Sequence, residues 1–398
     1  MFEGKNIVIG ITGGIAAYKM ATLASMLGKT KASVHIIMTE NAEKFITPVT
    51  FEALVKTKVH VDTFDREYHN TIAHIELAKN ADIFLVSPAS ANFIAKASHG
   101  MADDMLTTTF LAAKCPKFVA PAMNTAMLEN PITQDNIKTL QKYGIEIIQP
   151  SSGMLACGDV GSGKMAEPEV IFSYIERVIA RNKDMIGKNV LVTAGATRES
   201  LDPVRFITNH STGKMGFAIA KEAMLRGANV TIVKAMTSAP IPPFVKIIEV
   251  DSAEHMFEKV TEISDQMDIV IKAAAVADYT PIEYSDEKVK KKDGDLEIKL
   301  KRTKDILMYL GEHRRENQFI CGFSMETENL VENSTLKLNK KKADMIVANN
   351  LKVQGAGFGT DTNLVTLITK EGAHELEMMS KEKVSEKIFD KILEMMKK

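Results

Sequence analysis

The chain has 398 residues but only three cysteines, Cys115, Cys157 and Cys321, and no tryptophan. The cysteines lie far apart and form no C-x-x-C pair. This argues against a disulfide framework or a structural zinc site and favours a reducing compartment. The formal net charge is only −1, so no overall field attracts the protein to nucleic acid or to an anionic membrane. Local groups must therefore bind any phosphorylated ligand.

Long apolar runs are also missing. The longest run near the start, Ile7–Ala17, is interrupted by glycines, is too short to span a bilayer and is followed by no cleavage-site pattern. We therefore expect a cytoplasmic protein with no membrane partner. The nine histidines form no H-E-x-x-H motif, which argues against a histidine metal site.

Apolar strand-like runs alternate with helical patterns, which predicts an α/β fold whose parallel sheets are covered on both faces. The first half has predicted strands at Lys5–Ile11, Ser33–Thr39, Asp82–Ser87, Lys117–Pro121 and Ile145–Gln149, and predicted helices at Ala16–Leu27, Asp103–Ala113, Thr125–Tyr143 and Pro168–Arg181. The second half has predicted strands at Val190–Ala194, Asn229–Lys234, Lys246–Val250, Asp268–Ala273, Phe319–Ser324 and Asp344–Ala348. The charged segment Arg181–Lys188 separates the two halves. We therefore predict two Rossmann-like or flavodoxin-like domains in tandem, residues 1–186 and 187–398.

Each half contains a strand that runs into a glycine-rich turn and then a helix, at Asn6–Ala17 and at Asn189–Gly216. Amide groups at a helix start bind phosphate when glycines allow close approach. The first turn lacks the G-x-G-x-x-G spacing, and no acidic residue ends the next strand, which favours a mononucleotide over a dinucleotide. A plain tight turn is the alternative.

Small and hydroxyl residues follow further strands of the first half. Ser87–Asn92 and Gly100–Asp104 could receive a ring edge or a ribityl chain. Alternatively, Ser90 and Asp103 cap helices.

Three residues of the first half could take part in chemistry. His74 stands at a predicted helix start, where the dipole disfavours its protonated form and leaves a proton acceptor. Asn124 follows a strand and could bind a carboxylate, and Cys157 lies in the long loop Ser151–Lys164, where a thiol could donate a proton. The alternatives are a histidine with ordinary structural partners, a helix-capping asparagine and a buried cysteine.

The motifs GGIAAYK, AHIEL, SPASAN, PAMN and ACGD together resemble those of the flavin-containing cysteine decarboxylases. The whole chain resembles the bacterial bifunctional phosphopantothenoylcysteine decarboxylase/phosphopantothenate–cysteine ligases of coenzyme A biosynthesis. The resemblance implies FMN bound by Gly13, Gly14, Thr39, Ser87, Ser90 and Asn92. It makes His74 the active-site histidine, Asn124 a ligand of the substrate carboxylate and Cys157 the proton donor. A flavin is needed because oxidising the substrate thiol to a thioaldehyde creates an electron sink for loss of CO₂.

The segment Gly158–Lys164 (GDVGSGK) matches the core of a P-loop. However, Met165 replaces the required Ser or Thr, and no apolar strand precedes the segment. We interpret it as a flexible lid.

In the second half, the excursion Gly195–Ser211 contains cationic and amide side chains that suit a phosphorylated acid, although a solvated loop is the alternative. Asp278 follows a strand and could hold Mg²⁺ beside a triphosphate or cap a helix. The cationic run Lys288–Lys292 is typical of a solvent-exposed surface but could also bind phosphates. The alternation in Leu296–Leu300 predicts an edge strand or hairpin arm.

The motifs NHSTGKMG, AAVADY, KVKK and KDIL resemble those of the ligase half of the same family. The resemblance implies that CTP and phosphopantothenate form an acyl-cytidylate, which cysteine then attacks to release CMP. Asn209 would bind this intermediate, Lys288 would stabilise the triphosphate and Asp278 would bind Mg²⁺. Further contacts with nucleotide or substrate are implied for Lys272, Ala273, Ala274, Lys304, Asp305, Ile306, Leu307, Phe323, Lys337 and Lys341.

Thr303-Lys304 replaces the usual Asn-Pro of this family, which puts base contacts there in doubt. CTP rather than ATP, and a homo-oligomer, rest on the resemblance alone. Two other readings are a decarboxylase with a degenerate ligase half and a non-catalytic flavoprotein that binds a partner. Asn209, Asp278 and Lys288 argue against the first, and Cys157 argues against the second.

Overall fold

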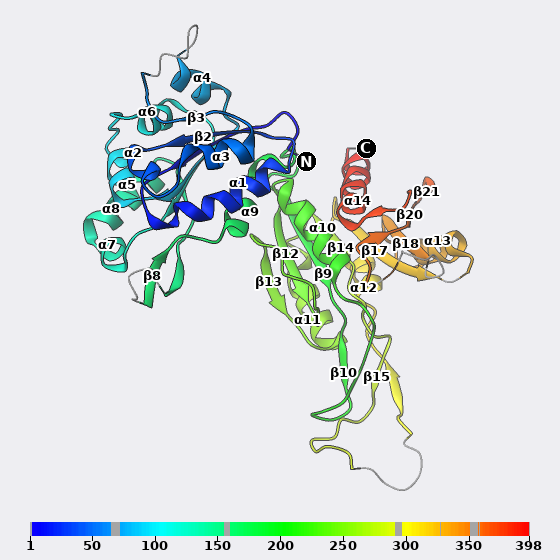
Figure 1. The fold of residues 1–398 in the computed structure, drawn as a ribbon. Coiled ribbons are helices and arrows are strands. Elements are labelled where there is room, and N and C mark those ends of the chain that lie inside the picture. The colour runs from blue at the N-terminus through cyan, green and yellow to red at the C-terminus, as the bar shows by residue number, and fades with distance from the viewer. Residues whose placement is uncertain are drawn as a thin grey trace. The chain divides into compact units, whose positions relative to one another are not determined.

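The computed structural model describes residues 2–64, 72–154, 160–290, 297–326, 328–350, 357 and 359–397 (Figure 1). The backbone divides into two compact units, Met1–Asn182 and Lys183–Lys398. Each unit contains a predominantly parallel sheet with helices, which confirms the predicted α/β fold class.

The sheet of the first unit has the order β3-β2-β1-β4-β5-β6, and all its neighbouring strands are parallel. Its strands are β1 Asn6–Ile11, β2 Ser33–Met38, β3 Val59–His60, β4 Ile83–Ala89, β5 Lys117–Pro121 and β6 Glu146–Ile147. Every residue of β4 is buried, as expected for a strand covered on both faces. The chain order reverses at β1, so the ligand crevice is expected beyond the carboxyl ends of β1 and β4.

Ten helices accompany this sheet in the described residues: η1 Ile15–Lys19, α1 Met20–Gly28, α2 Glu40–Glu43, α3 Pro48–Val55, α4 Ala73–Asn80, α5 Ala91–Ser98, α6 Met105–Ala112, α7 Thr125–Glu129, α8 Pro131–Lys142 and α9 Pro168–Ile179. The single helix predicted over Thr125–Tyr143 is wrong. Pro131 starts a second helix, and the Asn130 side chain caps it by accepting a hydrogen bond from the Ile132 amide.

The sheet of the second unit repeats this topology. Its order is β13-β12-β9-β14-β17-β18-β20-β21, in which the strands up to β18 are parallel and the last two are antiparallel. The strands are β9 Asn189–Ala194, β12 Asn229–Lys234, β13 Lys246–Glu249, β14 Ile269–Lys272, β17 Phe319–Glu326, β18 Met345–Asn350, β20 Val365–Thr369 and β21 Gly372–Glu375. Strand β9 therefore occupies the place of β1, and a second crevice is expected beyond β9 and β14.

The helices of this unit are α10 Lys214–Leu225, α11 Ala253–Ser264, α12 Ile306–His313, α13 Leu330–Lys340 and α14 Lys381–Met396. Helix α10 packs closely on β9, because a Cβ at Gly216 would lie 2.7 Å from the Cβ of Ala194. Among the residues that the structure describes, no helix is long and apolar enough to cross a membrane.

Two small antiparallel ladders form an arm that projects from the second sheet (Figure 1). They pair β10 Arg198–Ser200 with β11 Phe206–Thr208, and β15 Tyr279–Pro281 with β16 Leu300–Arg302. Of the edge strand or hairpin arm predicted over Leu296–Leu300, Leu300 lies in a strand, β16, and Leu296 lies outside the described residues. A third ladder pairs β19 Thr362–Asn363 with β22 Met379–Ser380.

Candidate active sites

A threonine hydroxyl joins the carboxyl ends of β1 and β4 beside the first crevice. The Thr12 hydroxyl, directly after β1, donates a hydrogen bond to the carbonyl of Pro88 at 2.7 Å. The same oxygen accepts a hydrogen bond from the amide of Ser90 at 2.9 Å. The next residue, Gly13, lies so close to the start of α2, which follows β2, that a Cβ there would be 2.6 Å from the Cβ of Asn41. Three strand ends are thus held together at one edge of the sheet.

The side chains at this edge fit the FMN that the motifs imply. The Thr39 hydroxyl is buried and has no hydrogen-bond partner among the described residues, an arrangement that a ligand atom would satisfy. Ser90 accepts a hydrogen bond from the Phe93 amide and so caps α5, whose start faces the same crevice. The Ser87 hydroxyl is buried and contacts the sulfur of Met165 at 3.3 Å, while Asn92 is exposed.

His74 is the second residue of α4 and is partly exposed. Since α4 leads back into β4, its start lies at the carboxyl edge of the sheet, on the side of the crevice. The Asn124 side chain accepts a hydrogen bond from the Ala126 amide at 2.9 Å and caps α7, so the capping alternative is confirmed. Capping uses the amide oxygen of Asn124 and also fixes the direction of its side chain.

Cys157 lies outside the described residues. The strands on either side of it, β7 Ser151–Met154 and β8 Val160–Lys164, form a hairpin. The hairpin is attached to the Asn124 loop, because the Met123 amide donates to the carbonyl of Gly163 at 3.1 Å. A Cβ at Gly163 would lie 2.3 Å from the Met123 carbonyl oxygen. This glycine therefore serves strand packing, and the P-loop alternative is wrong.

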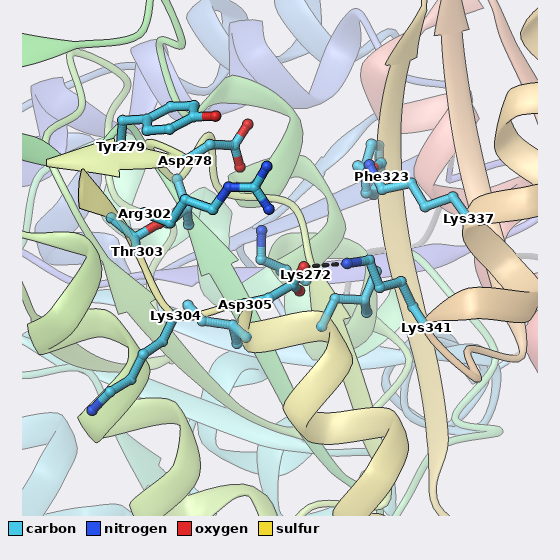
Figure 2. Close-up of a pocket in the computed structure, with 13 residues that line it drawn as sticks. Lys272, Asp278, Tyr279, Arg302, Thr303, Lys304, Asp305, Phe323, Lys337 and Lys341 are labelled. Atoms are coloured by element: carbon cyan, nitrogen blue, oxygen red, sulfur yellow. Dashed lines mark hydrogen bonds and ion pairs between the residues drawn. The ribbon is translucent and has the colours of Figure 1, made fainter. Parts of the chain in front are cut away.

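The second unit has a cleft made of two adjoining lobes of about 400 and 350 Å³, which share five lining residues. The first lobe (Figure 2) is lined by Lys272, Val276, Asp278, Tyr279, Arg302, Thr303, Lys304, Asp305, Ile306, Leu307, Phe323, Lys337 and Lys341. The second lobe is lined by the N-terminus of α10 from Ser211 to Gly216, by Asn209, Lys272–Val276, Asp278, Phe323, Met325, Lys337, Asn349, Gly357, Asn363 and Lys381. Of the residues predicted for the ligase half, Lys288 alone lines neither lobe.

Three lysines converge in the first lobe: Lys272 at the end of β14, Lys337 on α13 and Lys341 directly after it. Burial, and then the charge of Lys337, lower the pKa of Lys272 to about 8. Burial also lowers the pKa of Lys337, whose amine donates to the Phe323 carbonyl at 3.0 Å. Close cations of this kind are costly unless an anion joins them, so the lobe is suited to a polyanion.

The carboxylate of Asp305 balances part of this charge. Asp305 caps α12 by accepting a hydrogen bond from the Met308 amide at 2.9 Å, and it is ion-paired with Lys341. Burial opposes its ionisation, but the hydrogen bonds from Lys341 and the Met308 amide outweigh burial and keep its pKa below the usual value. Asp278 stands at the opposite wall and is exposed.

Lys304 lines the first lobe, but its amine is directed elsewhere. It donates to Glu254 at 2.6 Å and lies 4.9 Å from the centre of the Phe257 ring. Figure 2 shows this side chain pointing away from Lys272 and Asp305. A direct contact from the Lys304 amine to a bound nucleotide would require this ion pair to break.

Lys288 is exposed and lies in the segment between β15 and β16, the two strands of one ladder of the arm. The adjacent Val289 amide donates to the Asp202 carboxylate at 3.1 Å, and its carbonyl accepts from Arg205 at 2.7 Å. Side-chain hydrogen bonding from Arg205 holds the pKa of Asp202 well below its usual range. The segment that carries Lys288 is thus attached to the tip of the β10–β11 loop and not to the cleft.

Sequence reasoning missed Tyr279 and Arg302, which pair across β15 and β16 and line the first lobe. Figure 2 shows both side chains at the wall that carries Asp278. The alternation that predicted the arm could have placed Arg302 in a strand, but not opposite Tyr279. Among the described residues, no group of three or more His, Cys, Asp or Glu side chains could hold a metal ion.

Family models match both units: "Flavoprotein" matches residues 1–180, and "DNA/pantothenate metabolism flavoprotein C-terminal domain" matches residues 185–396. The chain is 46% identical over 396 residues to the Coenzyme A biosynthesis bifunctional protein CoaBC of Bacillus subtilis (strain 168), covering 98% of this chain and 97% of that one. It is 43% identical over 392 residues to the protein of the same name from Haemophilus influenzae (strain ATCC 51907 / DSM 11121 / KW20 / Rd), covering 98% of each.

The chain is also similar to a crystal structure of the C-terminal domain of a Coenzyme A biosynthesis bifunctional protein CoaBC, with 41% sequence identity. The match covers 55% of this chain and 99% of the chain in the crystal structure, with a TM-score of 0.47. The two family models and the two full-length relatives agree with the family that the motifs predicted. The chain belongs to the family of coenzyme A biosynthesis bifunctional proteins.

Proposed function

We propose that residues 187–398 join phosphopantothenate to cysteine at the expense of CTP, and that residues 1–186 then decarboxylate the product with FMN. The observation that carries the ligase assignment is the lysine-lined cleft, which combines a cationic first lobe with a second lobe at a helix N-terminus. The family to which the chain belongs supports both activities. Both reactions use small soluble molecules, so we place them in the cytoplasm.

In the ligase unit, the nucleoside occupies the first lobe between Phe323 and the start of α12, and the phosphates extend toward Lys272 and Lys337. The carboxylate of phosphopantothenate attacks the α-phosphorus, and pyrophosphate leaves with the electron pair of the broken P–O bond. The lysines stabilise the charge on the phosphates. Asp278, with phosphate oxygens, would hold Mg²⁺. Asn209 lines the second lobe and donates to the Ala275 carbonyl at 3.2 Å, a position suited to the acyl intermediate.

In the decarboxylase unit, bound FMN would supply the reversible two-electron oxidation that makes loss of CO₂ possible. Gly13, Gly14, Thr39 and the capped start of α5 would bind it. Asn124 would orient the substrate carboxylate, and His74 would accept a proton at the thiol. Cys157 would return a proton to carbon.

The pKa of Lys272 predicts how nucleotide affinity changes with pH. Its folded-state pKa of about 8 lies below the ordinary lysine value of 10.5, so its positive charge is lost as pH rises through about 8. We expect the KM for CTP to rise across this window, while binding itself causes proton uptake by Lys272. The measurement is the KM from about pH 6.5 to about 9.5. An arginine at position 272 stays charged over this pH range, so the KM for CTP of Lys272→Arg should change little with pH. An equally steep rise of the KM in that variant would show that another group causes the pH dependence.

We further propose that the arm mediates self-association and carries Lys288 to the cleft of a second copy. Large apolar side chains are exposed along it, an arrangement typical of an interaction surface. They are Val204, Phe206, Tyr279, Ile282, Tyr284, Ile298 and Leu300.

Lys288→Gln is expected to abolish acyl-cytidylate formation and leave decarboxylation of supplied phosphopantothenoylcysteine intact. Co-expressing a Lys288→Gln chain with a Lys272→Met chain should restore ligase activity, because each mixed assembly can combine one intact cleft with one intact Lys288. The measurement is pyrophosphate release by the purified hybrid. A hybrid no more active than either parent would rule out transfer of Lys288 between copies.

The overall proposal is tested by incubating the purified protein with phosphopantothenate, cysteine, CTP and Mg²⁺. We expect a yellow protein, stoichiometric pyrophosphate and CMP, and release of CO₂. Substituting ATP for CTP tests the nucleotide preference. A colourless protein that takes up no FMN, or one that releases no pyrophosphate, would contradict the assignment of the corresponding unit.

A further inference from the structure

Lys214, which lines the second lobe, forms an ion pair that the chemistry above does not use. Lys214 is the first residue of α10 and follows Gly213, which adopts the left-handed conformation with φ of 79°. The Lys214 amine donates to the Asp361 carboxylate at 2.7 Å and to the Gly359 carbonyl at 3.0 Å. These contacts hold the amine at the wall of the lobe in the absence of a bound anion.

The carboxylate of Asp361 is exposed, but its backbone is fixed. The side chain of Asp361 is 88% exposed and that of Lys214 is 35% exposed, and exposed pairs of this kind add little stability. The Asp361 carbonyl, in contrast, accepts a hydrogen bond from the Lys381 amide at 2.9 Å, beside the pairing of Thr362 with Ser380. A multiply charged anion can therefore take the amine from Asp361 without rearranging the backbone.

The position of Lys214 suits the end of a polyphosphate. It lines the same lobe as Lys272 and Lys337, which reach the phosphates in the proposed reaction. The first amides of the twelve-residue helix α10 lack helical acceptors and add to the positive potential of this lobe. When the bond between the α-phosphorus and the bridging oxygen breaks, negative charge grows on the departing pyrophosphate. A nearby ammonium stabilises that charge.

We propose that Lys214 binds the β- and γ-phosphates of the nucleotide and the departing pyrophosphate, and that Asp361 holds its amine until phosphate displaces the carboxylate. This inference rests on the proposed ligase function of the second unit. It assigns opposite effects to the two partners of one ion pair: Lys214 contributes to phosphate binding and Asp361 competes with it.

The test uses inorganic pyrophosphate with Mg²⁺ as the probe, measured by calorimetry and as product inhibition of the ligase reaction. Lys214→Met is expected to weaken pyrophosphate binding and raise the KM for CTP by about ten- to hundred-fold, the range of one charge-assisted hydrogen bond. Asp361→Asn is expected to tighten pyrophosphate binding several-fold, because it removes the competitor. The double variant should match Lys214→Met.

Lys383→Met is the matched control, because Lys383 forms a similar exposed ion pair with Glu386 at 2.7 Å in the first turn of α14 and lines neither lobe. It should leave pyrophosphate binding unchanged. All variants should decarboxylate supplied phosphopantothenoylcysteine at the normal rate. If the wild-type protein binds pyrophosphate but Lys214→Met binds it equally well, or Asp361→Asn weakens binding, the inference is overturned. If the wild-type protein neither binds pyrophosphate nor releases it from CTP, the proposed ligase function itself fails.

Discussion

Replacing Lys272 by methionine is expected to abolish nucleotide activation and to leave the flavin-dependent reaction intact. Methionine has a similar length and no charge, so the substitution removes an ammonium group from both lobes of the cleft with little change in packing. Losing one preorganised charge at a phosphoryl-transfer site costs about 10²–10³-fold in rate. The measurement is pyrophosphate release from CTP, with decarboxylation of supplied phosphopantothenoylcysteine followed in the same preparation.

Lys340→Met is the control for this substitution. Lys340 lies on α13, is exposed and lines neither lobe, so its loss removes a charge near the cleft without removing a ligand. We expect it to retain normal ligase activity. Normal pyrophosphate release by Lys272→Met would show that the converging lysines do not serve the nucleotide.

Replacing Gly13 by alanine is expected to abolish FMN binding and, with it, decarboxylation. The added Cβ would lie 2.6 Å from the Cβ of Asn41 and 2.9 Å from its backbone carbonyl oxygen, so the turn after β1 and the start of α2 must separate. That separation moves Thr39, whose buried hydroxyl lacks a partner among the described residues. The measurements are the visible flavin absorbance of the purified protein and its decarboxylase rate, with pyrophosphate release as the internal control.

Gly14→Ala separates steric disruption from ligand contact at this turn. Its backbone is extended, with φ of 176°, and a Cβ there would meet nothing within 4 Å, so the protein tolerates the change. Loss of flavin in this variant would show that the ligand itself approaches Gly14. Full FMN binding by Gly13→Ala would show that the turn at Gly13 is not part of the FMN site.

Most of the sheet architecture could be predicted from the sequence, because each parallel strand is a short continuous apolar run. Strands β5 and β12 were predicted to the residue, and β9 and β14 to within two residues at either end. Strand β3 has only two residues, Val59–His60, and left no pattern to detect. The break at Pro131 was missed because the apolar spacing continues across it, although proline at a helix start is itself a signal.

Asp278 was predicted from its position after β14, whereas Lys272, the last residue of that strand, was implied by the family motifs. In a parallel sheet, such residues reach a common edge whatever their separation along the chain. Lys288 lies far from this edge because it belongs to the arm, and its charge alone carried no information on position. Arg302 lines the first lobe because its strand, β16, pairs with β15, and Lys381 lines the second lobe as the first residue of α14, a helix distant in sequence. A local sequence pattern could therefore not place either residue in the cleft.

The shared wall of the two lobes implies that their occupants do not bind independently. Lys272 and Lys337 line both cavities, so an anion in either one alters the electrostatic potential felt by the other. The phosphates of a bound nucleotide repel an acidic second substrate, and the proton that Lys272 takes up on nucleotide binding offsets part of this repulsion. By thermodynamic linkage, the acid must change the affinity for the nucleotide by the same factor as the nucleotide changes the affinity for the acid. Coupling between the two substrates is therefore built into the cleft by Lys272 and Lys337, which line both lobes.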